Sequence, residues 1–360
     1  MLYATFKNSG KDSLVFYRLE PKHKRLLITL LSSFNQVVAM TGDGVNDAPA
    51  LKQADIGIAM GLSGTEVAKE AADLVLADDN FDSIVKAIEQ GRSIYDNMKA
   101  FIRYMISSNI GEVVCIFLGS VSGVPDVFSS VQLLWVNLVT DGLPAMALSF
   151  NEPDQDIMIK PPRNKDEPLV DKWVFLRYLI IGTYVGLATI GIFIYWFIAY
   201  DWADYPHTLI SYQQLTNWTK CSEWKDFEVL NPENFDLGKK NCGYFSIGKK
   251  KASSLSLSVL VIIEMFNSLN ALSENNSLLD TGLFANVWLL LAIFGSVSMH
   301  VLILYVPGLK LIFATTELSF NDWMLVIGFS WPVLLIDEVI KFFVRMFKKN
   351  RGELNCWKTE

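Results

Sequence analysis

The sequence lacks the features that mark several common classes of protein. It holds four cysteines in 360 residues, too few for a scaffold held together by disulfides. Its 31 Lys and Arg against 38 Asp and Glu give a formal net charge of −7, so no broad basic surface is expected and nucleic acid is excluded as a partner. The first residues, MLYATFKNSGKDSL, contain no apolar core of the length of a cleavable signal peptide. Any entry into a membrane must therefore be directed by internal segments.

Apolar residues, by contrast, are abundant. They make up 51% of the chain, and the mean hydropathy is +0.28. Six stretches each have roughly the 20 apolar residues that a helix needs to cross a bilayer. We predict spans at 101–122, 127–150, 173–200, 253–272, 284–306 and 322–347. Because the tail is basic, we expect both chain ends and loop 151–171 in the cytosol and loop 201–251 in the lumen.

The residue pattern of the first hundred residues is typical of a soluble α/β unit. Short apolar segments predict buried parallel strands at 36–40, 56–60 and 74–76. Helical patterns lie at 48–54, 67–72 and 80–95, and the last of these runs into the first predicted span without a break. We therefore predict three parts: a soluble domain at 1–92, a membrane domain at 93–347 and a cytosolic tail at 348–360.

Three predicted spans carry a carboxylate near their middle: Glu112, Asp141 and Glu264. A carboxylate at this depth is costly and is a functional-site hypothesis by default. The alternative is a structural acid that is protonated or hydrogen-bonded between helices. Three acids on separate spans favour the functional interpretation.

Further oxygen donors lie at helical spacing from these acids. Asn109 precedes Glu112 by three residues, and Asn137 and Thr140 share one helix face with Asp141. Pro144 follows and frees backbone carbonyl groups. The set contains oxygen ligands only, which Ca²⁺ prefers; transition metals and Mg²⁺ fit it less well.

A second motif lies in the soluble part, where residues 41–51 read TGDGVNDAPAL. A strand ends, glycines allow a tight turn, and Asp43 and Asp47 project where the strand meets a helix. Ligands bind at such strand ends in α/β folds, and acids there suit Mg²⁺ beside a phosphoryl group. The alternative is a plain Gly-Asp turn, but the strand, turn and helix together favour the site.

These motifs carry a resemblance to a known family. TGDGVNDAPAL resembles the hinge motif of P-type cation ATPases. ISSNIGEVVCIFL (106–118), QLLWVNLVTDGLPA (132–145) and LSVLVIIEMFNSLNALSEN (257–275) resemble the sarco/endoplasmic-reticulum calcium ATPases. The resemblance implies a fold of two parts: a partial haloacid-dehalogenase-like phosphorylation domain of α/β class, followed by an all-α bundle of six transmembrane helices.

The resemblance also implies residue roles. In the soluble domain, Asp43 would ligate Mg²⁺, Asp47 would order the same site, and Lys24 and Asn46 would contact the phosphoryl group or cofactor. In the membrane, one Ca²⁺ site would comprise Asn109, Glu112, Thr140, Asp141 and Glu264, and a second would share Asn137 and Asp141. Cys221 and Cys242, which an oxidising lumen would allow to pair, match the pair that closes the family's lumenal loop.

The implied activity is ATP-driven movement of Ca²⁺ from the cytosol into the reticulum lumen through an aspartyl phosphate. The family's phosphorylated aspartate lies in a DKTG motif, whereas Asp171-Lys172 is followed here by Trp173. We expect the chain to correspond to the C-terminal third of a pump and to be inactive alone. The expected partners are Ca²⁺, the lipid bilayer, the N-terminal pump domains and small membrane regulators.

Two alternatives belong to other classes. One is a non-catalytic membrane protein that acts as a Ca²⁺-binding modulator or leak, and the other is a membrane-tethered phosphatase. The phosphatase is the weakest hypothesis, because the nucleophilic aspartate of that fold is absent from the sequence. The sequon at Asn217-Trp218-Thr219 is expected in the lumenal loop, and its use stays open.

Overall fold

The computed structural model describes most of the chain. The described residues are 14–153, 157–159, 168–170, 172–201, 207–224, 227–230, 241–272, 277–278, 282 and 284–350. Most of the predicted tail at 348–360 lies outside them. The chain divides into two compact units, the first comprising residues 1–93 with 153–169 and the second 94–152 with 170–360.

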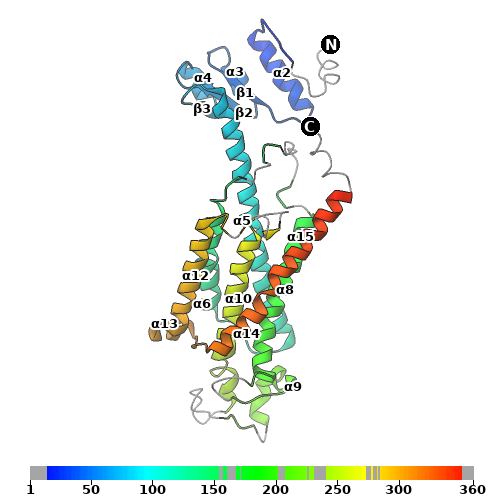
Figure 1. The fold of residues 1–360 in the computed structure, drawn as a ribbon, viewed down its shortest axis with the longest axis vertical. Coiled ribbons are helices and arrows are strands. Elements are labelled where there is room, and N and C mark those ends of the chain that lie inside the picture. Colours follow the sequence, from blue (N-terminus) through cyan, green and yellow to red (C-terminus); the bar gives the residue numbers. More distant parts are fainter. Residues whose placement is uncertain are drawn as a thin grey trace. The chain divides into compact units, whose positions relative to one another are not determined.

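The first unit contains a parallel sheet of three strands in the order β1-β2-β3 (Figure 1). They are β1 (Ala39–Gly42), β2 (Ile56–Met60) and β3 (Leu74–Leu76), with Ala39 opposite Ile56 and Ile58 opposite Leu74. The short helices α3 (Ala48–Leu51) and α4 (Glu66–Ala71) connect them. The α/β prediction is confirmed, although the first strand begins at Ala39 rather than at residue 36.

Apolar side chains anchor these elements to one another. Helix α2 (Pro21–Ser33) begins with proline, whose fixed φ suits a first helical turn, and it contributes buried Ile28. The three small clusters of buried side chains are Ile28, Val38 and Ala50; Leu51, Ala59 and Ala68; and Ile58, Met60 and Leu76. The packing fixes the turn after β1, where the acidic motif lies.

A single helix, α5, extends from Phe81 to Ser122 and passes the boundary between the two units. The predicted continuity between the amphipathic segment and the first apolar stretch is therefore confirmed. The first turns of α5 belong to the α/β unit, and the remainder belongs to the second unit.

The second unit is a helical bundle. Six of the helical segments in the described part of the chain are long and apolar enough to cross a membrane, which confirms the predicted number. After α5 they are the segment Ser130–Leu148, α8 (Lys172–Ile198), α10 (Lys250–Asn270), α12 (Val287–Tyr305), and α14 (Phe320–Ser330) with α15 (Pro332–Asn350). A short helix, α13 (Pro307–Phe313), links α12 to α14.

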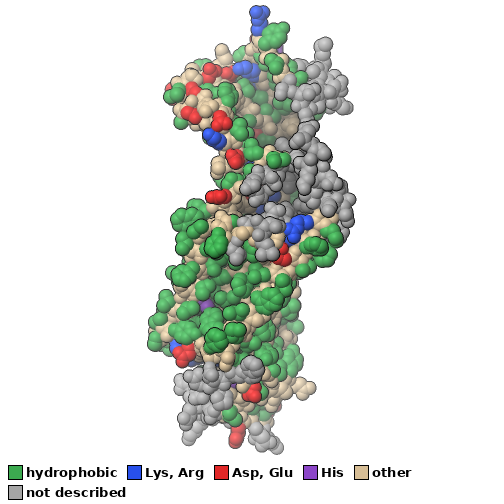
Figure 2. Space-filling view, viewed as in Figure 1, with side chains coloured by type: hydrophobic (Ala, Val, Ile, Leu, Met, Phe, Trp, Pro, Cys, Tyr) green, Lys and Arg blue, Asp and Glu red, His purple; other side chains and the backbone are tan. Residues whose placement is uncertain are grey.

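Helix α10 is the most buried of these segments and contacts α7, α8, α12, α14 and α15 (Figure 1). Apolar side chains cover the visible face of the bundle, as Figure 2 shows. Such a surface suits contact with lipid, because it leaves few polar groups without water.

Two spans are not uniform helices. The second consists of α6 (Ser130–Trp135), a π-helical turn η1 (Val136–Thr140) and α7 (Gly142–Leu148). The expected distortion is therefore present, but it lies before Gly142 and takes the form of a wide turn, in which the Asp141 amide donates to the Val136 carbonyl at 2.9 Å. The last span divides at Pro332, because proline cannot donate the hydrogen bond that would continue α14.

The segment between α8 and α10 forms a small capping layer. It contains α9 (Tyr212–Thr216), η2 (Trp218–Glu223) and η4 (Asn241–Phe245), and Cys221 and Cys242 form a disulfide with Cα atoms 5.7 Å apart. Aromatic rings pack beneath it, including Trp196, Phe197 and Phe245. The layer closes the end of the bundle at which α8 ends and α10 begins.

Helices α5 and α8 approach closely through glycines. A Cβ atom added at Gly182 would lie 2.6 Å from Cγ2 of Ile110, and one at Gly186 would lie 2.6 Å from Cγ1 of Val114. Both distances are far inside van der Waals contact. The two helices can therefore keep this spacing only with glycine at both positions.

We predict that Gly186→Ala lowers the free energy of unfolding by about 1–3 kcal/mol, because the added methyl group must push α5 and α8 apart. Thermal unfolding in detergent measures the change. Gly191→Ala on the same helix is the control, since its Cβ would meet its nearest neighbour, Phe329, at 3.7 Å. Equal stability of the two variants would contradict the prediction.

Candidate functional sites

The carboxylate of Glu112 is held by an amide from the neighbouring span. Glu112 lies on α5, and Asn137 lies on the π-helical turn η1. Nδ2 of Asn137 donates to Oε1 and Oε2 of Glu112 at 3.0 and 2.9 Å, and it also lies 3.2 Å from the carbonyl oxygen of Leu133. This contact brings the two predicted site residues together.

Asp141 ends the π-helical turn and is fully buried. Two hydroxyl groups from α5 donate to it: Tyr104 Oη to Oδ1 at 3.1 Å and Ser108 Oγ to Oδ2 at 2.5 Å. Because Ser108 and Glu112 are four residues apart, one face of α5 contacts Asp141 and also carries the other acid.

Glu264 lies in the middle of α10 and differs from the other two acids. Both of its carboxyl oxygens are buried, and neither has a hydrogen-bond partner among the described residues. Asp141 and Glu112 lie close enough for their charges to act on it. Asn267, one turn later on α10, donates to Oγ of Ser107 at 2.7 Å instead.

A buried carboxylate without a donor is unfavourable unless a cation or a proton balances it. The three acids lie on α5, directly after η1 and on α10, and their oxygen atoms are of the kind that a hard divalent cation prefers. Within the described residues, however, no three side chains of the types His, Cys, Asp and Glu are close enough to form a metal-binding group. Amide, hydroxyl or backbone oxygens would have to complete any cation site here.

Two predicted ligands lie differently from the acids. Asn109 is exposed, and its Nδ2 donates to the Met105 carbonyl at 2.7 Å, so its side chain does not join Glu112. Thr140 is buried, and its hydroxyl donates to the Val136 carbonyl at 2.8 Å. The backbone carbonyl of Thr140 accepts from Ser296 Oγ at 3.1 Å.

Sequence reasoning overlooked the residues that hold the acids. Tyr104 and Ser108 lie on the same span as the predicted ligand Glu112, at one or two helical turns from it. Helical spacing would have pointed to Ser108, four residues before Glu112. Tyr104 acts across helices, and nothing in its local sequence marks it.

The acidic motif in the α/β unit occupies the turn after β1. Asp47 is buried, and its Oδ1 pairs with Nζ of Lys24 on α2 at 2.6 Å. Asp43 and Asn46 of the same turn are exposed. Gly42 is needed here, because a Cβ at this position would lie 2.6 Å from the Cβ of Asp47. Lys24 and Asp47 are thus brought together, while Asp43 presents a carboxylate at the end of the strand.

A second loop borders this turn, since the Thr65 amide donates to the Asp43 carbonyl at 2.8 Å. Asp79 holds the loop by accepting from the amides of Leu62 at 2.9 Å and Ser63 at 2.7 Å. These hydrogen bonds, chiefly that from Leu62, lower the pKa of Asp79 from 3.8 to about 2. The stabilisation they provide is therefore present above about pH 4 and is lost as the pH falls through about 2.

We predict that Asp79→Ala increases hydrogen exchange at residues 61–65 at neutral pH, because two amides lose their ionised acceptor. Hydrogen exchange read by mass spectrometry checks this. Asp78→Ala is the matched control: Asp78 bonds Asn80 and Ser83 instead, so that variant should leave the loop unchanged. The interpretation fails if both variants exchange alike.

Comparison with known proteins identifies the family of this chain. Residues 125–343 match the family model described as cation transporting ATPase, C-terminus, and residues 23–88 match that of haloacid dehalogenase-like hydrolase. Similar proteins include a calcium-transporting ATPase of Plasmodium falciparum, which is 58% identical over 92% of this chain and 27% of its own length. The endoplasmic reticulum-type calcium-transporting ATPases 4 and 2 of Arabidopsis thaliana are 59% and 56% identical over 92% and 94% of this chain.

Fold and sites together define a multi-pass membrane protein whose helical bundle is joined to a dehalogenase-like α/β unit. More than half of the chain matches the first family model, so the chain belongs to the cation-transporting ATPase family. It spans about a third of the length of the two Arabidopsis relatives, which is 32% and 33%.

Proposed function

We propose that this chain is the ion-binding and phosphate-hinge part of an ATP-driven pump that moves Ca²⁺ from the cytosol into the endoplasmic reticulum. One observation carries the proposal: the buried carboxylate of Glu264 has no hydrogen-bond partner among the described residues and lies within reach of the charges of Asp141 and Glu112. The names of the similar proteins give the ion and the membrane.

Ca²⁺ is the transported substrate of the proposed sites. Glu264, Asp141 and Glu112 supply its carboxylate oxygens, and Asn137 and Thr140 supply an amide and a hydroxyl oxygen. Asn109 joins the set only if its side chain leaves the Met105 carbonyl. Ca²⁺ accepts such a set because it takes six to eight oxygen ligands in flexible geometry.

The turn after β1 is the proposed phosphoryl site. Exposed Asp43 is the residue that would hold Mg²⁺, while Lys24 and Asn46 lie where a transferring phosphoryl group would be contacted. Mg²⁺, when bound, neutralises charge on the phosphoryl oxygens. Asp47 holds Lys24 in place until a phosphate competes for its ammonium group.

Helix α5 is the proposed link between the two sites, because one helix carries residues of the α/β unit and Glu112. A change in the phosphoryl site would reach the acids through this helix and alternate their access between the two sides of the membrane. The soluble domain at 1–92, the membrane domain at 93–347 and the tail at 348–360 are the corresponding proposed parts. ATP binding and the remaining catalytic steps require the N-terminal pump domains.

A non-catalytic modulator or leak is the second candidate. Similarity to transporting ATPases extends over 92% of this chain and includes the phosphate-hinge motif, which a modulator would not need. This favours the pump. Small membrane regulators are proposed partners on family resemblance alone.

The proposed ligands are testable in a chimera in which this chain replaces the matching segment of the Arabidopsis calcium-transporting ATPase 4. We expect Glu112→Gln, Asp141→Asn and Glu264→Gln each to weaken Ca²⁺ binding about tenfold or more, because each removes a charged oxygen ligand. Equilibrium ⁴⁵Ca²⁺ binding to purified membranes measures the affinity.

Glu317→Gln is the control, since its side chain is 57% exposed and its carboxylate pairs with Lys310 at 3.0 Å. It should bind Ca²⁺ as the unaltered chimera does. Unchanged affinity in all three ligand variants would remove the site assignment.

A break in α5 tests the proposed link. We expect Met98→Pro in the same chimera to separate ATP hydrolysis from Ca²⁺ transport, because proline removes a hydrogen bond and kinks the helix between the two sites. The ratio of Ca²⁺ transported to phosphate released measures coupling, and Met98→Ala controls for loss of the side chain. A normal ratio in the proline variant would rule out α5 as the link.

A further inference from the structure

Helix α10, which carries Glu264, is held at both of its ends by cationic side chains that pair with buried carboxylates of the last span. We propose that these two ion clusters set the position of α10 along and about its axis, and so place Glu264 in the Ca²⁺ site. Lys251 and Asp322 form the first cluster, and Asp337 with Lys341 forms the core of the second. The inference rests on the proposed function.

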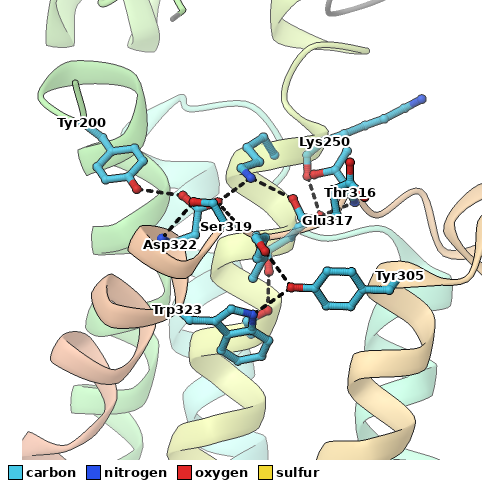
Figure 3. Close-up of polar contacts among 12 residues, drawn as sticks. Tyr200, Lys250, Tyr305, Thr316, Glu317, Ser319, Asp322 and Trp323 are labelled. Carbon is cyan, nitrogen blue, oxygen red and sulfur yellow. Dashed lines mark hydrogen bonds and ion pairs between the residues drawn. The ribbon is translucent and has the colours of Figure 1, made fainter. Parts of the chain in front are cut away.

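The first cluster lies where α10 begins (Figure 3). Nζ of Lys251 lies 2.5 Å from Oδ2 of Asp322 and donates to the Glu317 carbonyl at 2.8 Å. Tyr200 Oη donates to Oδ1 of Asp322 at 2.7 Å, and the Ser319 amide donates to Oδ2 at 2.8 Å. Asp322, which is 1% exposed, therefore joins the first turns of α10 and α14 to Tyr200, the second residue after the end of α8.

The second cluster lies where α10 ends. Nζ of Lys341 donates to the Asn270 carbonyl at 3.1 Å and pairs with Oδ2 of Asp337 at 3.0 Å. Nη2 of Arg103 on α5 donates to the Ala271 carbonyl at 2.7 Å. Arg177 of α8 forms an ion pair with Oδ1 of Asp337. The last carbonyl groups of α10 are thus bound by cations from two different helices.

The cationic side chains at the two ends of α10 interact differently with the dipole of that helix. Cations at the C-terminal carbonyl groups favour the helix dipole, whereas Lys251 at the N-terminus opposes it. The carboxylate of Asp322 balances that lysine. An apolar contact would hold the first turn without this conflict, so the buried pair offers a fixed geometry rather than extra stability.

A fixed geometry matters because neither carboxyl oxygen of Glu264 has a hydrogen-bond partner among the described residues, and Ser108 and Asn267, the polar side chains that act on it, bond other groups. One residue of axial slip would move its carboxylate by about 1.5 Å and turn it by about 100°. Ligands need placement to within about 0.5 Å. Apolar packing alone resists such slip weakly, since similar side chains of α10 recur along its length, as in LSLSVLVII.

The test uses variants that leave no buried charge unpaired. Lys251→Met with Asp322→Asn removes the first pair together. Lys341→Met removes the hydrogen bond to the Asn270 carbonyl, while Asp337 retains its ion pair with Arg177. Lys251→Arg and Lys341→Arg are the conservative variants. Lys310→Met is the matched control, because Lys310 pairs with the 57% exposed carboxylate of Glu317, whereas Lys251 bonds only the backbone carbonyl of that residue.

The measurements are the half-saturating Ca²⁺ concentration of transport in the chimera and the maximal rate per phosphorylated pump. We expect each neutral variant to raise half-saturation about fivefold with an unchanged maximal rate. The arginine variants and Lys310→Met should match the unaltered chimera.

Unchanged half-saturation in the neutral variants overturns the inference, as does a loss confined to the amount of folded protein. Glu264→Gln, measured alongside, separates the two proposals. If it weakens Ca²⁺ affinity while the cluster variants do not, only the positioning role fails. If it leaves affinity unchanged, the Ca²⁺ site itself fails.

Discussion

A carboxylate inside an apolar bundle must be matched by donors or by a cation, and this requirement organises the second unit. Glu112 and Asp141 receive amide and hydroxyl donors, whereas Asp322 and Asp337 receive lysine and arginine. Among these five, Glu264 is the one whose two carboxyl oxygens both lack a hydrogen-bond partner within the described residues. The bundle therefore contains acids that join its helices and one acid that its described side chains do not hold.

The helices themselves were predictable, since apolar runs of membrane length carry that information locally. The acids were found for the same reason, because a charge in an apolar run stands out. The donors to Asp141 were not found: Tyr104 and Ser108 approach it from another span, and such contacts depend on how helices turn toward each other. Asn109 was predicted from its spacing to lie beside Glu112. Its side-chain amide instead donates to the Met105 carbonyl of the same helix.

The α/β unit shows the same division between local and distant information. Strands, turn and acids of the TGDGVNDAPAL segment follow from residues within the segment, and the structure contains all of them. Asp79 accepts hydrogen bonds from the amides of Leu62 and Ser63, which lie about 16 residues earlier in the chain. No residue pattern in either loop predicts this contact. Lys24, 23 residues before Asp47, was suggested by resemblance and not by spacing.

The π-helical turn at Val136–Thr140 sets the direction in which Asp141 points from its helix. A π-helical turn holds one residue more than an α-helical turn, so every residue after it lies about 100° behind the position that it would have in an unbroken α-helix. Neither the composition nor the hydropathy of the segment predicts this offset. An α-helical turn made of the same residues would therefore turn Asp141 away from Tyr104 and Ser108. The orientation of this acid therefore depends on the hydrogen-bond pattern of the turn as well as on the identity of the residues.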